Sequence, residues 1–144
     1  PWGSYIPQGA AGVPTTTYGY NGYYLTPPAA SWWTTSIGRR PWQRLRTVRE
    51  PGKVFMLADT MLSWGAGVVA NNCLLDPPWL YFAGSWQPNR STTVCFRHRG
   101  HANVCFVDGH VAGVRPTVII DPQAMTGYVG ESNAPHYVPD WRDW

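Results

Sequence analysis

The sequence predicts one domain of the α+β to mainly β class, built on an antiparallel sheet with long loops. Its 144 residues are the size of one domain, and 44% of them are hydrophobic, which is ample for a single core. Only 13% are charged, whereas Gly, Pro and aromatic residues are frequent, a balance typical of loop-rich β proteins. A short apolar run at 102–107, an Asp-Gly pair and a second run at 110–114 indicate a β-hairpin.

This central hairpin, residues 102–114, organises the rest of the prediction. Asp108 and Gly109 both tolerate positive φ, as a two-residue type I′ turn requires. Such a turn would pair Val107 with His110, Phe106 with Val111, Cys105 with Ala112 and Val104 with Gly113. Both faces of the hairpin would then be apolar, so we expect a second layer over each, from this chain or from a partner.

The remaining elements follow from local patterns. We expect an irregular strand at 17–25, in which Asn21-Gly22 forms a turn or a bulge, and a short helix within 41–49. The other predicted strands are 53–59, 91–97 and, outside the main sheet, 118–120, and the long insert at 68–89 should carry its own packing. The sheet would then consist of 53–59, 91–97, 102–107 and 110–114.

Three regions make up the predicted domain organisation. Residues 1–16 read as an extended N-terminal arm, 17–120 as the globular head and 121–144 as a C-terminal tail that stays ordered only by docking. Large aromatic side chains in the two terminal segments would leave apolar area in water, so a partner surface should cover them. We therefore expect assembly contacts from Trp2, Tyr5, Tyr137, Trp141 and Trp144.

The hairpin also carries a family resemblance. His98, nine further residues and then Asp108-Gly109 resemble the H-x9-DG signature of bacterial prepilin-type proteins, the pilin-like and pseudopilin-like subunits of type IV pilus and type II secretion systems. Residues 18–23 (YGYNGY) are similar to the family's S-Y-x-x-N segment, and 48–59 to its P-S-x-x-x-x-x-A-D segment. The positions that match the hairpin consensus are Arg97, His98, Gly100, Ala102, Asn103, Val104, Phe106, Asp108, Gly109, His110 and Val111.

The resemblance implies a structural subunit of a pilus-like or pseudopilus-like filament, outside the cell or on its surface, that assembles with itself or with other pilin-like subunits. Family members begin with a leader and a long apolar helix, and nothing of this kind precedes Pro1, so we expect the chain to correspond to the globular head without the N-terminal helix. The motif residues with an implied structural role are His98, Gly100, Asn103, Phe106, Asp108, Gly109 and His110.

Histidine and aspartate recur around the hairpin, which raises the question of a metal site. A six-residue strand rising about 3.3 Å per residue would separate His98 and His101 from Asp108 and His110 by on the order of 20 Å. We therefore expect no metal and no cofactor. Asp108 should accept hydrogen bonds within its own turn, and His98 should order the Arg99-Gly100 turn.

An enzyme is not expected, because G-x-S-x-G and the Gly-rich phosphate loops are absent, and Asp59 reads as a residue that caps a turn. Two alternatives stay open. One is an extracellular module that binds glycan or another surface polymer through exposed Trp and Tyr, which requires coplanar rings in a groove. The other is a small metal-dependent enzyme, which requires ionisable groups converging in a cleft.

Three cysteines leave their pairing open. Cys105 lies in the best strand and reads as a small buried hydrophobe. A disulfide between Cys73 and Cys95 would close a loop of about 20 residues and stabilise the fold by about 3 kcal/mol. The alternative is three free thiols; no C-x2-C spacing suggests a metal.

The charge and hydropathy patterns limit the kinds of partner that we expect for this chain. The net charge is +3 and the pI about 9.0, with ten Arg, one Lys and no basic run longer than two. We interpret the local cluster of Arg39, Arg40, Arg44, Arg46 and Arg49 as a solvated surface rather than a nucleic-acid site. No stretch approaches 18 apolar residues, so no membrane span is expected in this chain.

Overall fold

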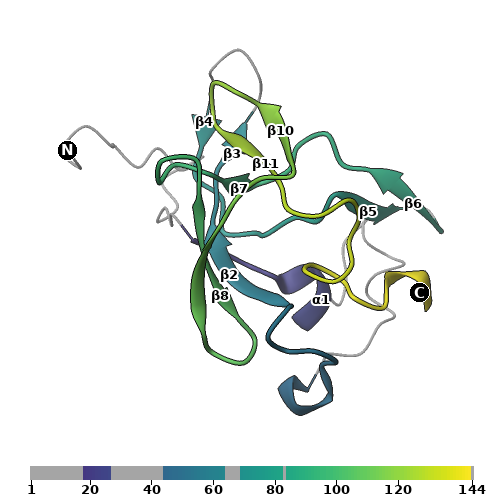
Figure 1. Cartoon of the computed structure of the whole chain (residues 1–144). Helices are drawn as coiled ribbons and strands as arrows, with labels where there is room; N and C mark the ends of the chain where they lie inside the picture. The colour runs from purple at the N-terminus through teal and green to yellow at the C-terminus, as the bar shows by residue number, and fades with distance from the viewer. Residues whose placement is uncertain (1–17, 27–43, 64–68, 83, 144) are drawn as a thin grey trace.

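The computed structural model describes residues 18–26, 44–63, 69–82 and 84–143, and its chain is mainly antiparallel β-structure (Figure 1). The elements are β1 (Tyr18–Tyr20), α1 (Gly22–Leu25), the 3₁₀ helix η4 (Leu45–Thr47), β2 (Phe55–Asp59), β3 (Leu62–Ser63), β4 (Val69–Ala70), β5 (Trp79–Phe82), β6 (Ser85–Pro88), β7 (Val94–Cys95), β8 (Ala102–Phe106), β9 (Val111–Val114), β10 (Val118–Asp121), β11 (Thr126–Tyr128) and the 3₁₀ helix η5 (Trp141–Asp143). The predicted antiparallel, strand-rich class is confirmed.

The largest sheet has the strand order β1-β2-β8-β9, and every pair in it is antiparallel. Strand β2 lies within the predicted strand 53–59, and its apolar run places it in the middle of the sheet beside β8 (Figure 1). Within this pair Phe55 lies opposite Phe106, and Ala58 lies opposite Val104. All four of these residues are buried and form the inner face of the sheet.

The prediction that residues 91–97 belong to this sheet is wrong. Strand β7 pairs with β11 in a three-stranded sheet of order β10-β11-β7, which also contains the predicted strand near 118–120. The two sheets are joined where Thr60, directly after β2, bridges Val94 of β7. The residues at 91–97 predict a strand, and a strand forms there. Its partner is β11, in the C-terminal tail, where the sequence has no strand pattern.

The hairpin of β8 and β9 forms, but its register differs from the prediction by one residue. Cys105 lies opposite Val111, and the Phe106 N–H donates to the His110 carbonyl at 2.9 Å, so the loop has three residues, 107–109. The Gly109 N–H closes the turn on the Phe106 carbonyl, with Gly109 at φ 92°. Asp108 does not adopt positive φ, so the type I′ prediction is wrong; the loop is a turn followed by one left-handed glycine.

This register changes which residues share a face. Ala102, Val104 and Phe106 of β8 point into the core, whereas Asn103 between them is exposed. On β9 the side chain of Val111 is 68% exposed, contrary to its predicted place beside Val104 and Phe106. The outer face of the hairpin, with Asn103, Val111 and Gly113, is therefore exposed in this chain, and the expectation that Val111 shares the inner face is wrong.

A two-residue turn with both φ values positive does occur, at Arg99-Gly100. Arg99 has φ 55° and Gly100 has φ 80°, and the backbones of His98 and His101 exchange hydrogen bonds of 3.0 and 3.1 Å. This is the geometry of a type I′ hairpin turn. The predicted turn at this position is confirmed, and it fixes the approach of the chain into β8.

Asn21 begins a helix rather than a turn or bulge. Its side-chain oxygen accepts from the Tyr24 N–H at 3.3 Å and so caps α1, which is the usual role of Asn before a first helical turn. Its amide nitrogen donates to the carbonyls of Phe55 at 2.9 Å and Tyr137 at 2.8 Å. The fully buried side chain therefore ties α1 to β2 and to the C-terminal segment.

Within the predicted insert at 68–89, β5 pairs with β6, and β4 pairs with β3, which lies before the insert. Side chains cover the outer edge of β5: the Asn133 amide bonds both the N–H and the carbonyl of Trp79, at 2.9 Å each. The Tyr23 hydroxyl accepts from the Tyr81 N–H at 2.7 Å and donates to its carbonyl at 3.3 Å. These contacts occupy backbone groups that an edge strand would otherwise present to water.

The C-terminal tail docks on the chain's own core. Tyr137 and Val138 are fully buried in the core cluster, and the His136 carbonyl accepts from the Phe55 N–H at 2.8 Å. The assignment of Tyr137 as an assembly residue is therefore wrong, because its ring packs against Phe55 with centroids 5.4 Å apart. Trp141 is half-buried against the same core. Trp2, Tyr5 and Trp144 lie outside the described residues.

Candidate functional site

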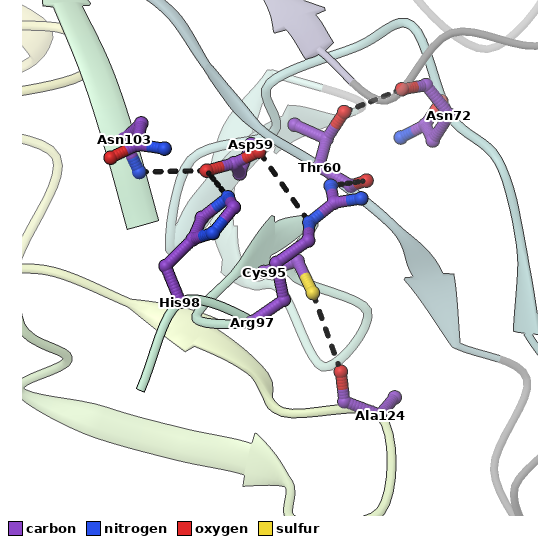
Figure 2. A network of polar contacts seen from close by, with 8 residues as sticks. All are labelled: Asp59, Thr60, Asn72, Cys95, Arg97, His98, Asn103 and Ala124. Carbon is purple, nitrogen blue, oxygen red and sulfur yellow. Dashed lines mark hydrogen bonds and ion pairs between the residues drawn. The ribbon is translucent and has the colours of Figure 1, made fainter. Parts of the chain in front are cut away.

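The densest polar site in the described chain surrounds Asp59, at the end of β2 (Figure 2). The Asp59 side chain is only 2% exposed. Its Oδ2 accepts from the Asn103 N–H at 2.7 Å and lies 3.1 Å from Nε2 of His98. Its Oδ1 lies 3.4 Å from Nε of Arg97. One backbone N–H and the side chains of His98 and Arg97 thus converge on one buried carboxylate, which is how a folded chain stabilises a charge away from water.

Chain topology explains this convergence. The antiparallel pairing that sets Ala58 opposite Val104 continues by one residue and brings Asp59 beside the Asn103 backbone. The tight turn at 98–101 precedes β8 directly and swings Arg97 and His98 onto the same carboxylate. Figure 2 shows His98 directed at one oxygen of the Asp59 carboxylate and Arg97 at the other.

Further contacts extend the network between the two sheets. Arg97 donates from Nη2 to the Thr60 carbonyl at 2.8 Å, and the Thr60 hydroxyl donates to the Asn72 carbonyl at 2.5 Å. The buried Cys95 thiol lies 3.5 Å from the Ala124 carbonyl (Figure 2), and burial raises the pKa of this thiol. The network therefore joins β2, β7 and the loop before β11.

His98 and Asp59 are the pair of ionisable side chains at the centre of this site. An Asp-His pair can orient a general base, but such a base needs a nucleophile within hydrogen-bond reach. In the described chain, the only side-chain partner of the His98 imidazole is Asp59. The same described residues contain no group of three or more His, Cys, Asp or Glu side chains placed to hold a metal ion.

Asp108 lies at the other end of β8 and makes a separate, local site. Its Oδ1 accepts from the His110 N–H at 3.1 Å and contacts Nδ1 of the same residue at 2.6 Å. The hydrogen bond from the His110 backbone holds the pKa of Asp108 below its ordinary value. The His110 ring stacks on Phe106 with centroids 4.0 Å apart. The predicted role of Asp108 within its own turn is confirmed.

The motif residues therefore divide into two groups, one at each end of β8. His98, Gly100 and Asn103 belong to the Asp59 end, and Phe106, Asp108, Gly109 and His110 belong to the loop end. His98 does more than the predicted ordering of its turn, because its ring reaches the buried carboxylate. From the sequence alone we expected Asp59 only to cap a turn. Its place in this site is indicated by the Ala58-Asp59 pair, which matches the end of the family segment at 48–59.

The three cysteines are free thiols in the structure. Cys73 is exposed, Cys95 is buried and Cys105 is half-buried. Of the two alternatives left open by the sequence, the structure therefore has free thiols and not the Cys73–Cys95 disulfide. Cys105 is less buried than expected, because it lies on the outer side of β8 between inward-facing Val104 and Phe106.

The described tryptophans pack mainly on one another. The rings of Trp79 and Trp141 stack with centroids 6.1 Å apart, and Trp86 meets Trp141 edge-on at 86°. Tyr81 in turn meets Trp86 at 62°. A glycan-binding platform needs flat faces side by side in a groove, and in this cluster Trp86 and Tyr81 instead meet their neighbours edge-on.

Comparison with known proteins finds no matching protein family, no matching curated protein and no matching solved structure. Among the residues that the structure describes, no helix is long and apolar enough to cross a membrane. Arg44, Arg46 and Arg49 are exposed, whereas Arg39 and Arg40 lie outside the described residues.

Proposed function

We propose that this chain is the globular head of a pilin-like or pseudopilin-like structural subunit, which acts outside the cell or on its surface by assembling with copies of itself or with related subunits. It performs no catalysis in this role. The observation that carries the proposal is the resemblance to the H-x9-DG family, together with the place of its three segments in the fold.

The three segments that carry the resemblance form one unit. Residues 18–23 supply β1 and Asn21, residues 48–59 supply β2 and Asp59, and residues 97–111 supply β8 and the loop into β9. These are three of the four strands of the largest sheet, in direct contact through Asn21 and Asp59. These segments are far apart in the sequence and meet in one sheet. This supports a structural motif shared with the family rather than a chance likeness of sequence.

The bonding of the motif residues also favours a structural role. In the interior Asp59 accepts a hydrogen bond from the Asn103 N–H and lies against His98 and Arg97, and Asp108 accepts a hydrogen bond from His110 within its own loop. Residues that serve a reaction generally leave a donor, acceptor or nucleophile directed at a substrate. The polar groups of the motif are instead used to hold the two ends of β8.

The surface provides apolar positions that could be covered by neighbouring subunits. Among the described residues, the large apolar side chains with an exposed fraction of 36% or more are Tyr18, Leu45, Val69, Leu74, Val111, Ile120 and Met125. Aromatic and aliphatic residues of this kind form the centres of protein interfaces. A self-assembling head would bury several of them against its neighbours.

Immunogold electron microscopy tests the proposal directly. Antibodies raised against the folded chain are applied to material sheared from the source cells, and we expect regular labelling along filaments. Antibody pre-absorbed with the purified chain is the control and should remove the label. Filaments without label, together with the chain recovered only as an isolated monomer, would overturn the proposal.

A further inference from the structure

Strand β9 is an outer strand of the largest sheet, and among the described residues its outer edge differs from the opposite edge, β1, and from the edges of the three-stranded sheet. The opposite edge, β1, is covered: the Tyr20 N–H donates to the Cys73 carbonyl at 2.9 Å, and the Tyr20 carbonyl accepts from the Leu75 N–H at 3.0 Å. Close approach of this covering segment is allowed by Gly19, where a Cβ would lie 2.8 Å from the Leu74 backbone. The β1 edge therefore cannot accept another strand.

The smaller sheet also has protected edges. Strand β7 is bridged to Thr60, and the Met61 N–H donates to the Thr93 carbonyl at 2.8 Å. Strand β10 has a register irregularity between Ile119 and Asp121, and the Asp121 carboxylate accepts a hydrogen bond from Ser63. Bulges and inward-held charges are the usual means by which proteins block edge-to-edge pairing.

Strand β9 has none of these devices within the described chain. Its sequence is Val-Ala-Gly-Val, without proline, charge or bulge. Because the His110 carbonyl accepts from Phe106 and backbone directions alternate along a strand, the N–H and C=O groups of Val111 and Gly113 point away from β8. No hydrogen bond to these four groups is found among the described residues.

We propose that β9 pairs antiparallel with β9 of a second copy of this chain, joining the two four-stranded sheets edge to edge. With the two-fold axis at Ala112, Val111 lies opposite Gly113 of the second copy, and both pairs exchange backbone hydrogen bonds. This proposal deepens the proposed function, because it assigns one surface by which the head would self-associate.

The charges near the ends of β9 favour pairing with β9 of a second copy over pairing with an unrelated strand. The register places Arg115 opposite Gly109 of the second copy and therefore beside its Asp108. Asp108 is an exposed carboxylate, and Arg115 is an exposed guanidinium that uses Nε to bond His101 at 3.0 Å. Because of the two-fold axis, this attraction between Arg115 and Asp108 occurs twice in the dimer. Val111 would also cover Gly113 of the second copy, which has no side chain of its own.

Sedimentation equilibrium of the full 144-residue chain tests the pairing. A charged residue on a sheet edge blocks further pairing, so Val111→Lys should raise the dimer dissociation constant at least about tenfold. The control is Gln123→Lys, which adds the same charge at an exposed position outside β9 and should alter the constant less than about twofold.

A second variant and a second readout separate pairing from folding. Gly113→Pro removes an N–H that faces away from β8, so it should abolish dimers while the thermal melt changes little. Hydrogen exchange should show that the amides of Val111 and Gly113 become protected as concentration rises. A wild-type chain that stays monomeric at high concentration, or dimers unaffected by both variants, would overturn the inference. If filaments are labelled but neither variant changes dimer formation, only the pairing through β9 is overturned, and the proposed function stands.

Discussion

The imidazole of His98 and the carboxylate of Asp59 lie 3.1 Å apart, although the two residues belong to different segments of the chain. Asp59 is almost fully buried, whereas His98 is about one-third exposed. Removing a side chain that contacts a buried carboxylate leaves that carboxylate with less compensation, which costs more than the contact contributes in net stability. The site therefore acts as a specific constraint on how β2 meets the turn at 98–101.

The loop at 107–109 gives the first prediction. Gly109 has φ 92°, a conformation that a β-branched residue adopts only with strain, so Gly109→Val should lower the free energy of unfolding by about 2 kcal/mol. Asp108→Asn should have a smaller effect, because the Asn side-chain oxygen can still accept from the His110 N–H. Urea unfolding measures both. Equal and severe losses would indicate that the charge of Asp108 is essential to the fold.

Asp76 gives a pH prediction. Burial raises its pKa to about 6, above the ordinary value of 3.8, so the folded chain binds this proton more tightly than the unfolded chain. The resulting stabilisation is complete below pH 3.8 and is lost as the pH rises through 6. Asp76→Asn should therefore raise the free energy of unfolding at pH 7 by roughly 1 to 3 kcal/mol.

The measurement is the difference in unfolding free energy between wild type and Asp76→Asn at several pH values. We expect this difference to shrink as the pH falls from 7 to 4. Asp143→Asn, at an exposed position in η5, is the matched control and should show no such trend. A constant difference across the range would mean that Asp76 does not titrate as proposed.

Some of this fold could be predicted because its signals are local. The apolar runs at 53–59 and 102–107 are strands whatever their partners, and both were predicted. Pairing is not local, so the placement of β7 beside β11 instead of in the main sheet could not be read from its own residues. The Asp108-Gly109 pair is compatible with a two-residue or a three-residue loop, and only the backbone shows that Gly109 alone is left-handed.

The candidate site was predicted in part. The local bond between Asp108 and His110 follows from their spacing, whereas the contact of His98 with Asp59 depends on the register of β2 and β8. Burial of Tyr137 could not be predicted for a similar reason. Its segment has no hydrophobic period, and it is held by single contacts such as the Asn21 amide on the Tyr137 carbonyl.

The thiols give a third prediction. Cys73 is exposed and should react quickly with a thiol reagent such as dithiobisnitrobenzoate. Cys95 should react only after unfolding, because it is buried and its pKa is raised by that burial, which lowers the thiolate fraction. The measurement is reagent uptake with and without denaturant, with Cys73→Ser as the control. Absence of titratable thiol at Cys73 and Cys95 until a reductant is added would show a disulfide.

The C-terminal segment gives a fourth prediction. Deleting residues 136–144 removes the fully buried Tyr137 and Val138 and the carbonyl that binds the Phe55 N–H, so the core sheet should unfold or lose at least about 3 kcal/mol. Deleting only 142–144 is the control and should have little effect. Circular dichroism melts compare the two. A stable sheet after the longer deletion would contradict the docking of the tail on its own core.

The central claim is that the polar residues of the motif hold the fold together rather than perform chemistry. A double-mutant cycle with Asp59→Asn, His98→Gln and the double variant, measured by urea unfolding, tests it most directly. We expect each single change to lower the free energy of unfolding. The two changes should be coupled by about 1 to 3 kcal/mol, because either one removes the contact between His98 and Asp59. Additive effects, with no coupling between Asp59 and His98, would contradict it.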